Sequence, residues 1–286
     1  MKNKGFIATV LVPAFVWVGV FTFLPIIGAF VISFFEYNPL RSVNRFVGIA
    51  NFTKLMKDTT FIKSLTNTLT FVFFAVVINL LLSLLIAQAI AKLKSNKTRS
   101  YFRVVFFMPC VAPLVASATV LGNIFSTKRG LINLYLGTSI GWLSDPKWVM
   151  ITMIIVTLWA DIGYNIVLLS AGIDGIPSEF YEAAALDGAS EWKKFTKVTI
   201  PLLSRTFAFV SAMTVISYFQ MFAQFQVMLT RGGPMNSGSV LTYYIYRMGF
   251  VEKDMGYASA VSLVLFAIIM VITLVQNRIN KTEWEY

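Results

Sequence analysis

Residues 171–202 read AGIDGIPSEFYEAAALDGASEWKKFTKVTIPL and form the longest polar break in a strongly apolar chain. A short helix is expected to open at Ser178, whose hydroxyl can cap free backbone N–H groups. Gly188 is expected to end that helix, because glycine adopts the left-handed conformation at little cost. Ser190 can cap a second helix, which is expected to stop before Pro201. This helix–glycine–helix unit, with alanines that let another backbone come close, predicts a surface on which a partner docks.

The composition indicates a membrane protein. Of 286 residues, 57% are hydrophobic and 13% are charged, which is more apolar and less charged than a soluble globular domain. A helix needs about 20 apolar residues to cross a bilayer, and the chain holds several runs of that length. The net charge of +11 is spread over the loops between these runs. This placement argues against a nucleic-acid partner and favours cytoplasmic loops that face anionic lipid.

Six apolar runs predict an all-α, polytopic membrane protein with a single transmembrane domain over residues 1–286. The first run is about twice as long as the apolar region of a signal peptide and lacks a cleavage site, so we expect a retained helix. Six spans place both termini on the side of the 173–205 loop, and five basic residues in segment 92–103 favour the cytoplasm for that side. The expected spans are residues 6–35, 68–91, 104–126, 148–172, 206–230 and 255–276.

Residue content excludes several kinds of chemistry. The chain has no histidine and one cysteine, Cys110, which removes Ser-His and Cys-His catalysis, a disulfide framework and most metal chemistry. It also has no G-x-x-x-x-G-K-[ST] loop for phosphate. We therefore expect the chain to bind neither ATP nor another cofactor, and not to be an enzyme.

The polar break resembles a known motif. Glu182-Ala183-Ala184 is followed after three residues by Gly188, and nine further residues lead to Val198-Thr199-Ile200-Pro201. This spacing resembles the cytoplasmic EAA loop of ABC importer permeases. Val198 stands where that loop commonly has isoleucine and Ile200 where it commonly has leucine, and both changes are conservative. The surrounding AGIDGIPSEFYEAAALDGA is similar to the carbohydrate-uptake branch, the family of maltose-type permeases.

The resemblance implies a type I ABC importer permease fold, in an ATP-driven carbohydrate importer of a prokaryotic cell membrane. The chain would be one of two homologous permease subunits. Two ATPase subunits would carry ATP and Mg²⁺, and an extracytoplasmic solute-binding protein would dock on the outer loops 36–67 and 231–254. Residues 173–205 would form the coupling loop that contacts the ATPase. The coupling residues implied by the resemblance are Glu182, Ala183, Ala184, Asp187, Gly188 and Pro201.

Polar side chains inside the spans are candidates for a substrate pathway. Asp161 is the only acidic residue in a predicted span; a charge there costs about 2.5–3.5 kcal/mol and should face protein or water. Residues 217, 220 and 224 follow helical spacing and predict one polar stripe, whose amides and hydroxyls suit sugar hydroxyls. Such residues can also serve only to join helices, at about 0.6 kcal/mol each. The candidates are Asn79, Trp159, Asp161, Asn165, Ser217, Tyr218, Gln220 and Gln224.

Two alternatives remain open at this stage. The same importer architecture could carry glycerol phosphate or another small polar solute, although the spans contain no Lys or Arg to pair with an anion. A different class would be an ion-coupled carrier that uses Asp161 as its coupling carboxylate. Such carriers typically show repeats between their halves, and none is found here.

Overall fold

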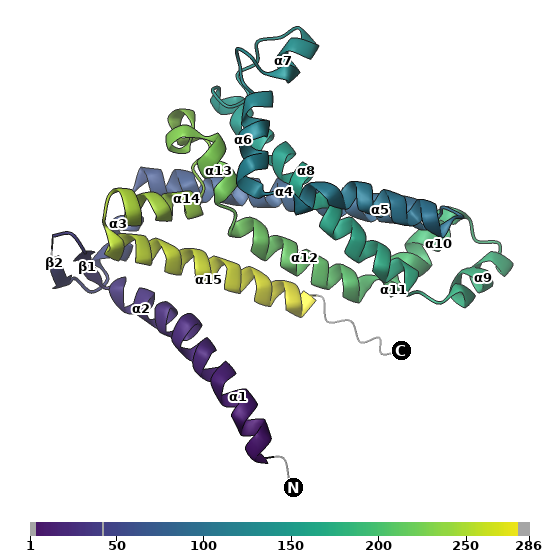
Figure 1. Ribbon diagram of the computed structural model, residues 1–286, viewed down its shortest axis with the longest axis horizontal. Helices are drawn as coiled ribbons and strands as arrows, with labels where there is room; N and C mark the ends of the chain where they lie inside the picture. The colour runs from purple at the N-terminus through teal and green to yellow at the C-terminus, as the bar shows by residue number, and fades with distance from the viewer. Residues whose placement is uncertain (1–3, 42, 280–286) are drawn as a thin grey trace. The chain divides into compact units, whose positions relative to one another are not determined.

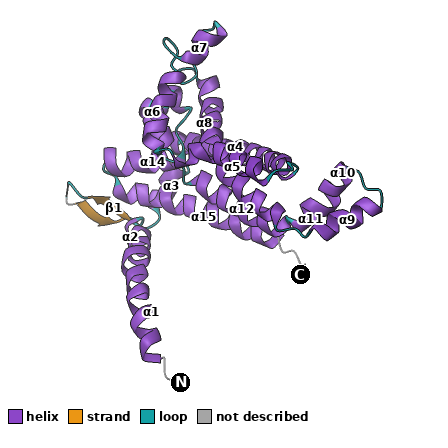
Figure 2. Ribbon diagram, turned by 45° about the vertical axis from the view of Figure 1, so that its right-hand side comes forward, coloured by secondary structure: helices purple, strands orange, loops and turns teal. Residues whose placement is uncertain are grey.

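A computed structural model describes residues 4–41 and 43–279. Helices form nearly all of this part of the chain, and a two-stranded sheet is added near its beginning (Figures 1 and 2). The predicted all-α class is confirmed. The two-stranded hairpin is an addition to this class.

The chain divides into two compact units. The first joins residues 1–62 to residues 241–267, and the second joins residues 63–240 to residues 268–286. Two long helices, α4 (Thr59–Ala91) and α15 (Met255–Ile279), contribute residues to both units.

The first unit begins with a long apolar helix that bends through a π-helical turn. Its span Leu11–Ile32 buries none of its residues within the chain, so its apolar surface is left for lipid or another protein. Strands β1 and β2 then pair antiparallel, with Phe35 opposite Phe46. The elements are α1 (Lys4–Val18), a π-turn (Gly19–Phe23), α2 (Leu24–Ile32), β1 (Phe35–Asn38), β2 (Val43–Phe46), α3 (Ala50–Leu55), α14 (Leu241–Tyr246) and a π-turn (Arg247–Val251).

One carboxylate joins three helices of the first unit. Asp58 Oδ1 accepts hydrogen bonds from the backbone N–H groups of Thr60 (2.8 Å) and Phe61 (3.1 Å), and so caps the start of α4. Asp58 Oδ2 accepts from the hydroxyls of Tyr244 in α14 (2.5 Å) and Tyr257 in α15 (2.6 Å). This cap explains why the helix of the second span begins at Thr59 rather than near residue 68.

The hairpin is held to the same unit by close backbone contact. The Asn51 side-chain amide donates to the carbonyl oxygens of Ser33 (2.8 Å) and Phe35 (3.0 Å). A methyl group added at Gly256 would lie 1.9 Å from the Phe35 oxygen. The start of α15 can therefore approach β1 only because residue 256 has no side chain.

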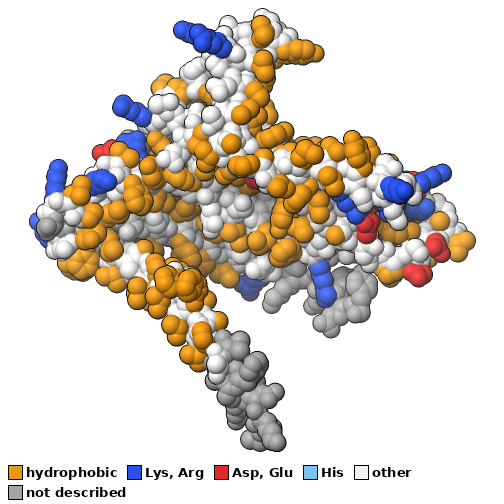
Figure 3. Space-filling model, in the orientation of Figure 1, with side chains coloured by type: hydrophobic (Ala, Val, Ile, Leu, Met, Phe, Trp, Pro, Cys, Tyr) orange, Lys and Arg blue, Asp and Glu red, His pale blue; other side chains and the backbone are white. Residues whose placement is uncertain are grey.

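The second unit contains the rest of the helices and the coupling loop. Apolar side chains cover the visible surface of its long helices, whereas charged side chains gather over α9, α10 and the beginning of α5 (Figure 3). With most of α4, its helices are α5 (Asn96–Val111), α6 (Leu114–Ile124), α7 (Leu131–Leu136), α8 (Pro146–Asp174), α9 (Ser178–Leu186), α10 (Glu191–Lys194), α11 (Ile200–Leu202), α12 (Ser204–Phe219) and α13 (Ala223–Met228).

The third predicted span is broken. Helices α5 and α6 meet at an angle of 92°, where residues 104–126 were expected to form one helix. Ala112 lies in the extended region (φ −67°, ψ 139°), the conformation favoured before a proline, and Pro113 cannot donate to the preceding turn. Within the described residues, five helices are long and apolar enough to cross a membrane, or six if this bent pair is one span.

Contacts at the C-terminal end of α8 bear on how the bent pair α5–α6 is counted. Asp174 at the end of α8 pairs with Arg103 in the middle of α5, at 2.6 Å, and with Arg99 in the first turn of α5, at 3.6 Å. Helix α8 has 29 residues, or about 43 Å at 1.5 Å per residue, enough to cross a bilayer. Because α5 starts beside the end of α8, residues 96–145 lead the chain from one end of α8 to the other. This favours counting α5 and α6 together as one broken span.

One candidate span covers Ser204–Met228, in agreement with the fifth span expected over residues 206–230, although its helix is interrupted where α12 ends at Phe219 and α13 begins at Ala223. One further expectation is corrected. The second helix of the coupling loop was expected to stop before Pro201, but helical structure continues through α11. A π-turn at Phe195–Thr199 lets the Ile200 N–H reach the Phe195 carbonyl, five residues back. The same device precedes Pro25 in the first span, where a proline would otherwise clash with the preceding turn.

We predict that Asp58→Asn lowers the melting temperature of the purified chain at pH 7. An amide cannot serve both the α4 cap and the two tyrosine hydroxyls as an acceptor, and hydrogen bonds to a charged group are worth on the order of 1–3 kcal/mol. Glu36→Gln is the control, because it removes an exposed carboxylate with no partner among the described residues. Thermal unfolding followed by tryptophan fluorescence measures both variants.

The pH dependence of the Asp58 effect has a definite sign. Burial raises the pKa of Asp58, but hydrogen bonds from Tyr244, Tyr257, Phe61 and Thr60 outweigh burial and hold the pKa below its ordinary value. Its contribution is therefore complete above about pH 4, the unfolded value, and is lost as the pH falls through the lower folded pKa. The gap between wild type and Asp58→Asn should narrow on acidification, and a gap that is constant with pH would contradict this account.

Candidate functional site: a coupling surface and an intramembrane cavity

The coupling loop folds as two short helices around a glycine, as predicted. Helix α9 ends at Leu186, and Gly188 adopts the left-handed conformation (φ +71°). The Ala189 N–H donates to the Ala184 carbonyl at 2.9 Å and the Gly188 N–H to the Ala185 carbonyl at 3.0 Å, which satisfies the last turn.

The two caps of the loop differ from each other. Ser190 accepts from the Lys193 N–H at 3.4 Å and caps α10 as expected. The expected Ser178 cap is wrong: the cap position of α9 is Pro177, and no side chain caps it. Ser178 is the first helical residue and lies one position too late for the role.

The described residues leave the outer face of α9 uncovered. Helix α9 contains no buried residue, and Leu186 is 91% exposed. Glu182, Ala183, Asp187 and Gly188 are also exposed. Among the described residues Glu182 has no ion pair or hydrogen-bond partner for its side chain. The predicted coupling residues Ala184 and Pro201 are half-buried and exposed, respectively. A small, exposed, apolar knob with one free carboxylate is suited to docking.

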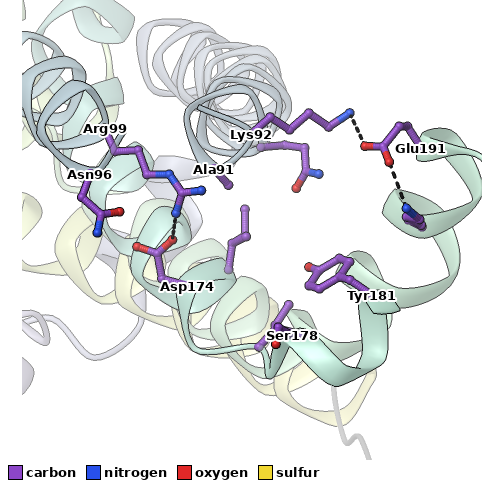
Figure 4. A pocket seen from close by; sticks show the side chains of 12 residues that line it. Ala91, Lys92, Asn96, Arg99, Asp174, Ser178, Tyr181 and Glu191 are labelled. Atoms are coloured by element: carbon purple, nitrogen blue, oxygen red, sulfur yellow. Dashed lines mark hydrogen bonds and ion pairs between the residues drawn. The ribbon is translucent and has the colours of Figure 1, made fainter. Parts of the chain in front are cut away.

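A cavity of about 520 Å³ separates this loop from the connection between α4 and α5 (Figure 4). Lys92 at its far wall reaches Glu191 of α10 at 3.3 Å, and Lys194 pairs with the same carboxylate at 3.2 Å. Hydrogen bonds from Lys194 and then Lys92 lower the pKa of Glu191. The loop is thus joined to the α4–α5 connection across a void, mainly by charge.

The other end of the loop is held by a two-arginine contact. Asp174, the last residue of α8, accepts from Arg103 Nη2 at 2.6 Å and lies 3.6 Å from Arg99 Nη1. Arg99 also donates from Nε to the Leu93 carbonyl at 2.7 Å. These three residues were not among the site residues predicted from the sequence. The basic segment 92–103 is visible in the sequence, but only the fold shows that Asp174 is the partner of its arginines.

A hydrogen-bonded network lies inside the helices of the second unit. The Asn79 amide donates to the Tyr218 hydroxyl at 2.7 Å, and Asn165 Nδ2 donates to Asn79 Oδ1 at 2.7 Å. Asn165 Nδ2 also donates to the Thr214 hydroxyl at 2.9 Å. The network therefore joins α4, α8 and α12. Three of the predicted pathway residues meet here, and Thr214 joins them as a residue that sequence reasoning missed, although it lies one helical turn before Tyr218.

A cavity of about 180 Å³ opens beside this network. It contains four of the predicted pathway residues: Asp161, Asn165, Ser217 and Tyr218. Typical ligand pockets hold roughly 300–1,000 Å³, so the cavity within this chain is small for a ligand. No group of three or more metal-ligating side chains is found over the described residues.

The remaining candidates lie elsewhere. Trp159 is 44% exposed and does not line the cavity. The predicted stripe of Ser217, Gln220 and Gln224 on one helix face is wrong, because the helix breaks between Phe219 and Ala223. Gln220 is exposed at the break, whereas Gln224 is buried and accepts from the Thr157 hydroxyl at 3.3 Å.

Comparisons with known proteins agree with this architecture. Residues 80–283 match the family described as "Binding-protein-dependent transport system inner membrane component". The probable ABC transporter permease protein YurN of Bacillus subtilis is 31% identical over 99% of each chain. The lactose transport system permease protein LacF of Rhizobium radiobacter is 33% identical over 92% of this chain and 90% of that one.

A solved structure shares the fold. It is a bacterial alginate ABC transporter in complex with a periplasmic protein that holds an alginate pentasaccharide. One of its chains superimposes with a TM-score of 0.86 at 24% identity, covering 98% of this chain and 97% of that one. At this identity the likeness concerns the fold alone.

We predict that Asp174→Asn loosens the coupling loop. Loss of the carboxylate leaves Arg99 and Arg103 side by side without their shared partner. A partly exposed ion pair is worth about 1 kcal/mol, which corresponds to about fivefold faster opening. Limited trypsin digestion in detergent, with mass spectrometry of cleavage after Lys193 and Lys197, measures it. Asp187→Asn makes the same charge change in the same loop without breaking an ion pair, and equal cleavage of the two variants would contradict the role given to Asp174.

Proposed function

The chain belongs to the family of binding-protein-dependent transport system inner membrane components, and we propose that it forms half of the membrane pathway of an ATP-driven sugar or oligosaccharide importer. The observation that carries the proposal is the exposed coupling knob of α9, with its free Glu182 and its left-handed Gly188. A relative named for lactose transport, 33% identical over nearly the whole chain, supports a carbohydrate as the substrate.

The ATPase is proposed to be a separate chain. Glu182 pairs with a basic residue of that partner, and Ala183, Ala184 and Gly188 fit a narrow cleft on it. Asp187 and Pro201 bound the same surface. ATP and Mg²⁺ bind to the ATPase pair, and this chain holds no cofactor. When the ATPase pair closes, it moves the coupling loop, and the contacts of Asp174 with α5 pass that movement to the helices around the cavity.

A second permease subunit completes the pathway in this proposal. The cavity beside the polar network is small for a saccharide, and the span Leu11–Ile32 leaves its apolar surface uncovered. A homologous subunit against this chain enlarges the cavity from the other side. The pathway candidates Asn79, Asn165, Ser217 and Tyr218 then supply hydrogen-bond donors and acceptors for sugar hydroxyls, and tyrosine rings cover apolar C–H faces.

The proposed orientation counts α5 and α6 as one crossing. Six spans then leave both termini and the coupling loop on one side, and we place that side in the cytoplasm because the ATPase is proposed to dock there. The loops at 36–67 and 231–254 then face outward and receive an extracytoplasmic solute-binding protein. The family assignment leaves no role for an ion-coupled carrier. Import of glycerol phosphate or another small polar solute through the same architecture is separated from sugar import by competition for uptake.

The proposal is tested first by purification through a tag on this chain from its native membrane. An ATPase with a phosphate-binding loop and a second six-span protein are expected in the mass spectrum of the purified complex. A parallel purification of an unrelated tagged membrane protein gives the background. Recovery of this chain alone, in a detergent that preserves other membrane complexes, would overturn the proposed assembly.

Gly188→Arg is expected to abolish transport and release the ATPase while the chain still inserts. Among the described residues, apart from its chain neighbours, no atom lies within 4 Å of a Cβ added at Gly188. The left-handed backbone (φ +71°) disfavours any side chain there, so the extra bulk of arginine is what meets a partner's cleft. Gly188→Asn is the matched control, because asparagine tolerates the left-handed conformation and is much smaller. Co-purification of the ATPase and ATP-dependent uptake measure both. Normal transport by Gly188→Arg would show that this surface does not dock.

A further inference from the structure

Asp161 lies at mid-depth of its helix and lines the intramembrane cavity. It precedes Asp174, at the coupling-loop end of α8, by thirteen residues, or about 20 Å at 1.5 Å per residue. The hydrocarbon core of a bilayer is about 30 Å thick. A carboxylate at this depth is costly unless it faces protein or water, and the cavity provides that setting.

No basic group neutralises this carboxylate. Among the described residues Asp161 makes no ion pair and no side-chain hydrogen bond, and the cavity lining contains no Lys or Arg. A carboxylate that served only to join helices would have a partner within reach, as Asp58 and Asp174 do. Asp161 is therefore the unmatched charge of the cavity.

The neighbouring polar groups are ordered by contacts on their far side. Asn165 is held by Asn79 and Thr214, and the Tyr218 oxygen accepts from Asn79. With its oxygen occupied as an acceptor, Tyr218 keeps its own O–H free to donate. The cavity thus presents one negative acceptor, Asp161, beside hydroxyls of neutral side chains.

We propose that Asp161 is a specificity-determining residue, which restricts the substrate to uncharged or cationic saccharides and excludes anionic ones. Sugar hydroxyls or an ammonium group donate to the carboxylate in charge-assisted hydrogen bonds. A uronate or phosphate meets a like charge where the dielectric is low and repulsion is strong. The inference rests on the proposed function and deepens it, by naming the charge class of the substrate.

The first test measures the charge of the cavity and does not depend on transport. Ser217→Cys, in a Cys110→Ser background, places one thiol in the lining. Methanethiosulfonate reagents carrying either a quaternary ammonium or a sulfonate are allowed to react with it in the tagged complex in lipid nanodiscs. Tyr135→Cys in the same background is the control, because residue 135 is 91% exposed and lies in α7.

We expect the ratio of cationic to anionic reaction rates to be at least about tenfold higher at the Ser217→Cys thiol than at the Tyr135→Cys thiol. Adding Asp161→Asn should bring the two ratios together. An unchanged ratio after Asp161→Asn would overturn the proposal, since the carboxylate would then be uncharged or turned away from the cavity.

The second test measures saccharide selectivity at the same thiol. Glucose, glucosamine and glucuronate share one ring and differ in charge, so each is tested for protection of the Ser217→Cys thiol from N-ethylmaleimide. Glucose and glucosamine should protect at concentrations at least about tenfold lower than glucuronate, and Asp161→Asn should remove that difference. Equal protection by all three in the Asp161 protein, or protection by none, would overturn the proposal. Failure of the proposed function would instead appear as absence of the ATPase from the complex, with both thiol assays still readable.

Discussion

The close contact of α8 with α5 determines where both candidate sites lie. A methyl group added at Gly163 would fall 1.9 Å from the Phe106 carbonyl oxygen, so the two backbones touch at a point where only glycine fits. In a membrane the hydrophobic effect does not drive helices together, and small residues stabilise helix packing by letting the backbones come close. Because α8 is a continuous helix, this one contact fixes Asp161 two residues before it and Asp174 eleven residues after it. The positions of the cavity and of the end of the coupling loop therefore both depend on this contact.

The contacts that join the coupling loop to α4 and α5 differ in kind from those that join the helices to one another. The loop forms ion pairs with the α4–α5 connection, through Lys92 and Glu191, and with α5, through Arg99, Arg103 and Asp174, around a cavity of about 520 Å³. Exposed ion pairs contribute little free energy, whereas apolar packing resists displacement. Helix α9, which has no buried residue, can shift more easily than the later part of the loop, where Phe195, Thr199 and Leu203 are buried. The Arg103–Asp174 pair is more buried than the Lys92–Glu191 pair. A movement of the loop would therefore reach α5 through Asp174.

Local signals in the sequence predicted the loop and most helices, and long-range contacts account for what they missed. Gly188 and Ser190 behave as their types dictate, because a left-handed turn and a cap depend on neighbours within a few residues. The break after Phe219 contains neither Pro nor Gly, so no local rule marks it. The early start of α4 depends on Asp58, whose tyrosine partners lie about two hundred residues away. The network of Asn79, Asn165 and Tyr218 was selected residue by residue, but its geometry required three helices to be placed.

The absence of Lys and Arg from the cavity lining matters because the amides beside the cavity are already hydrogen-bonded. In a site whose amides are already bonded to one another, a ligand meets few free partners, so a single unpaired carboxylate dominates the electrostatic potential. The charge class proposed for the substrate is therefore assigned to side chains such as Asp161, which can change in charge while Gly163 keeps α5 and α8 in contact.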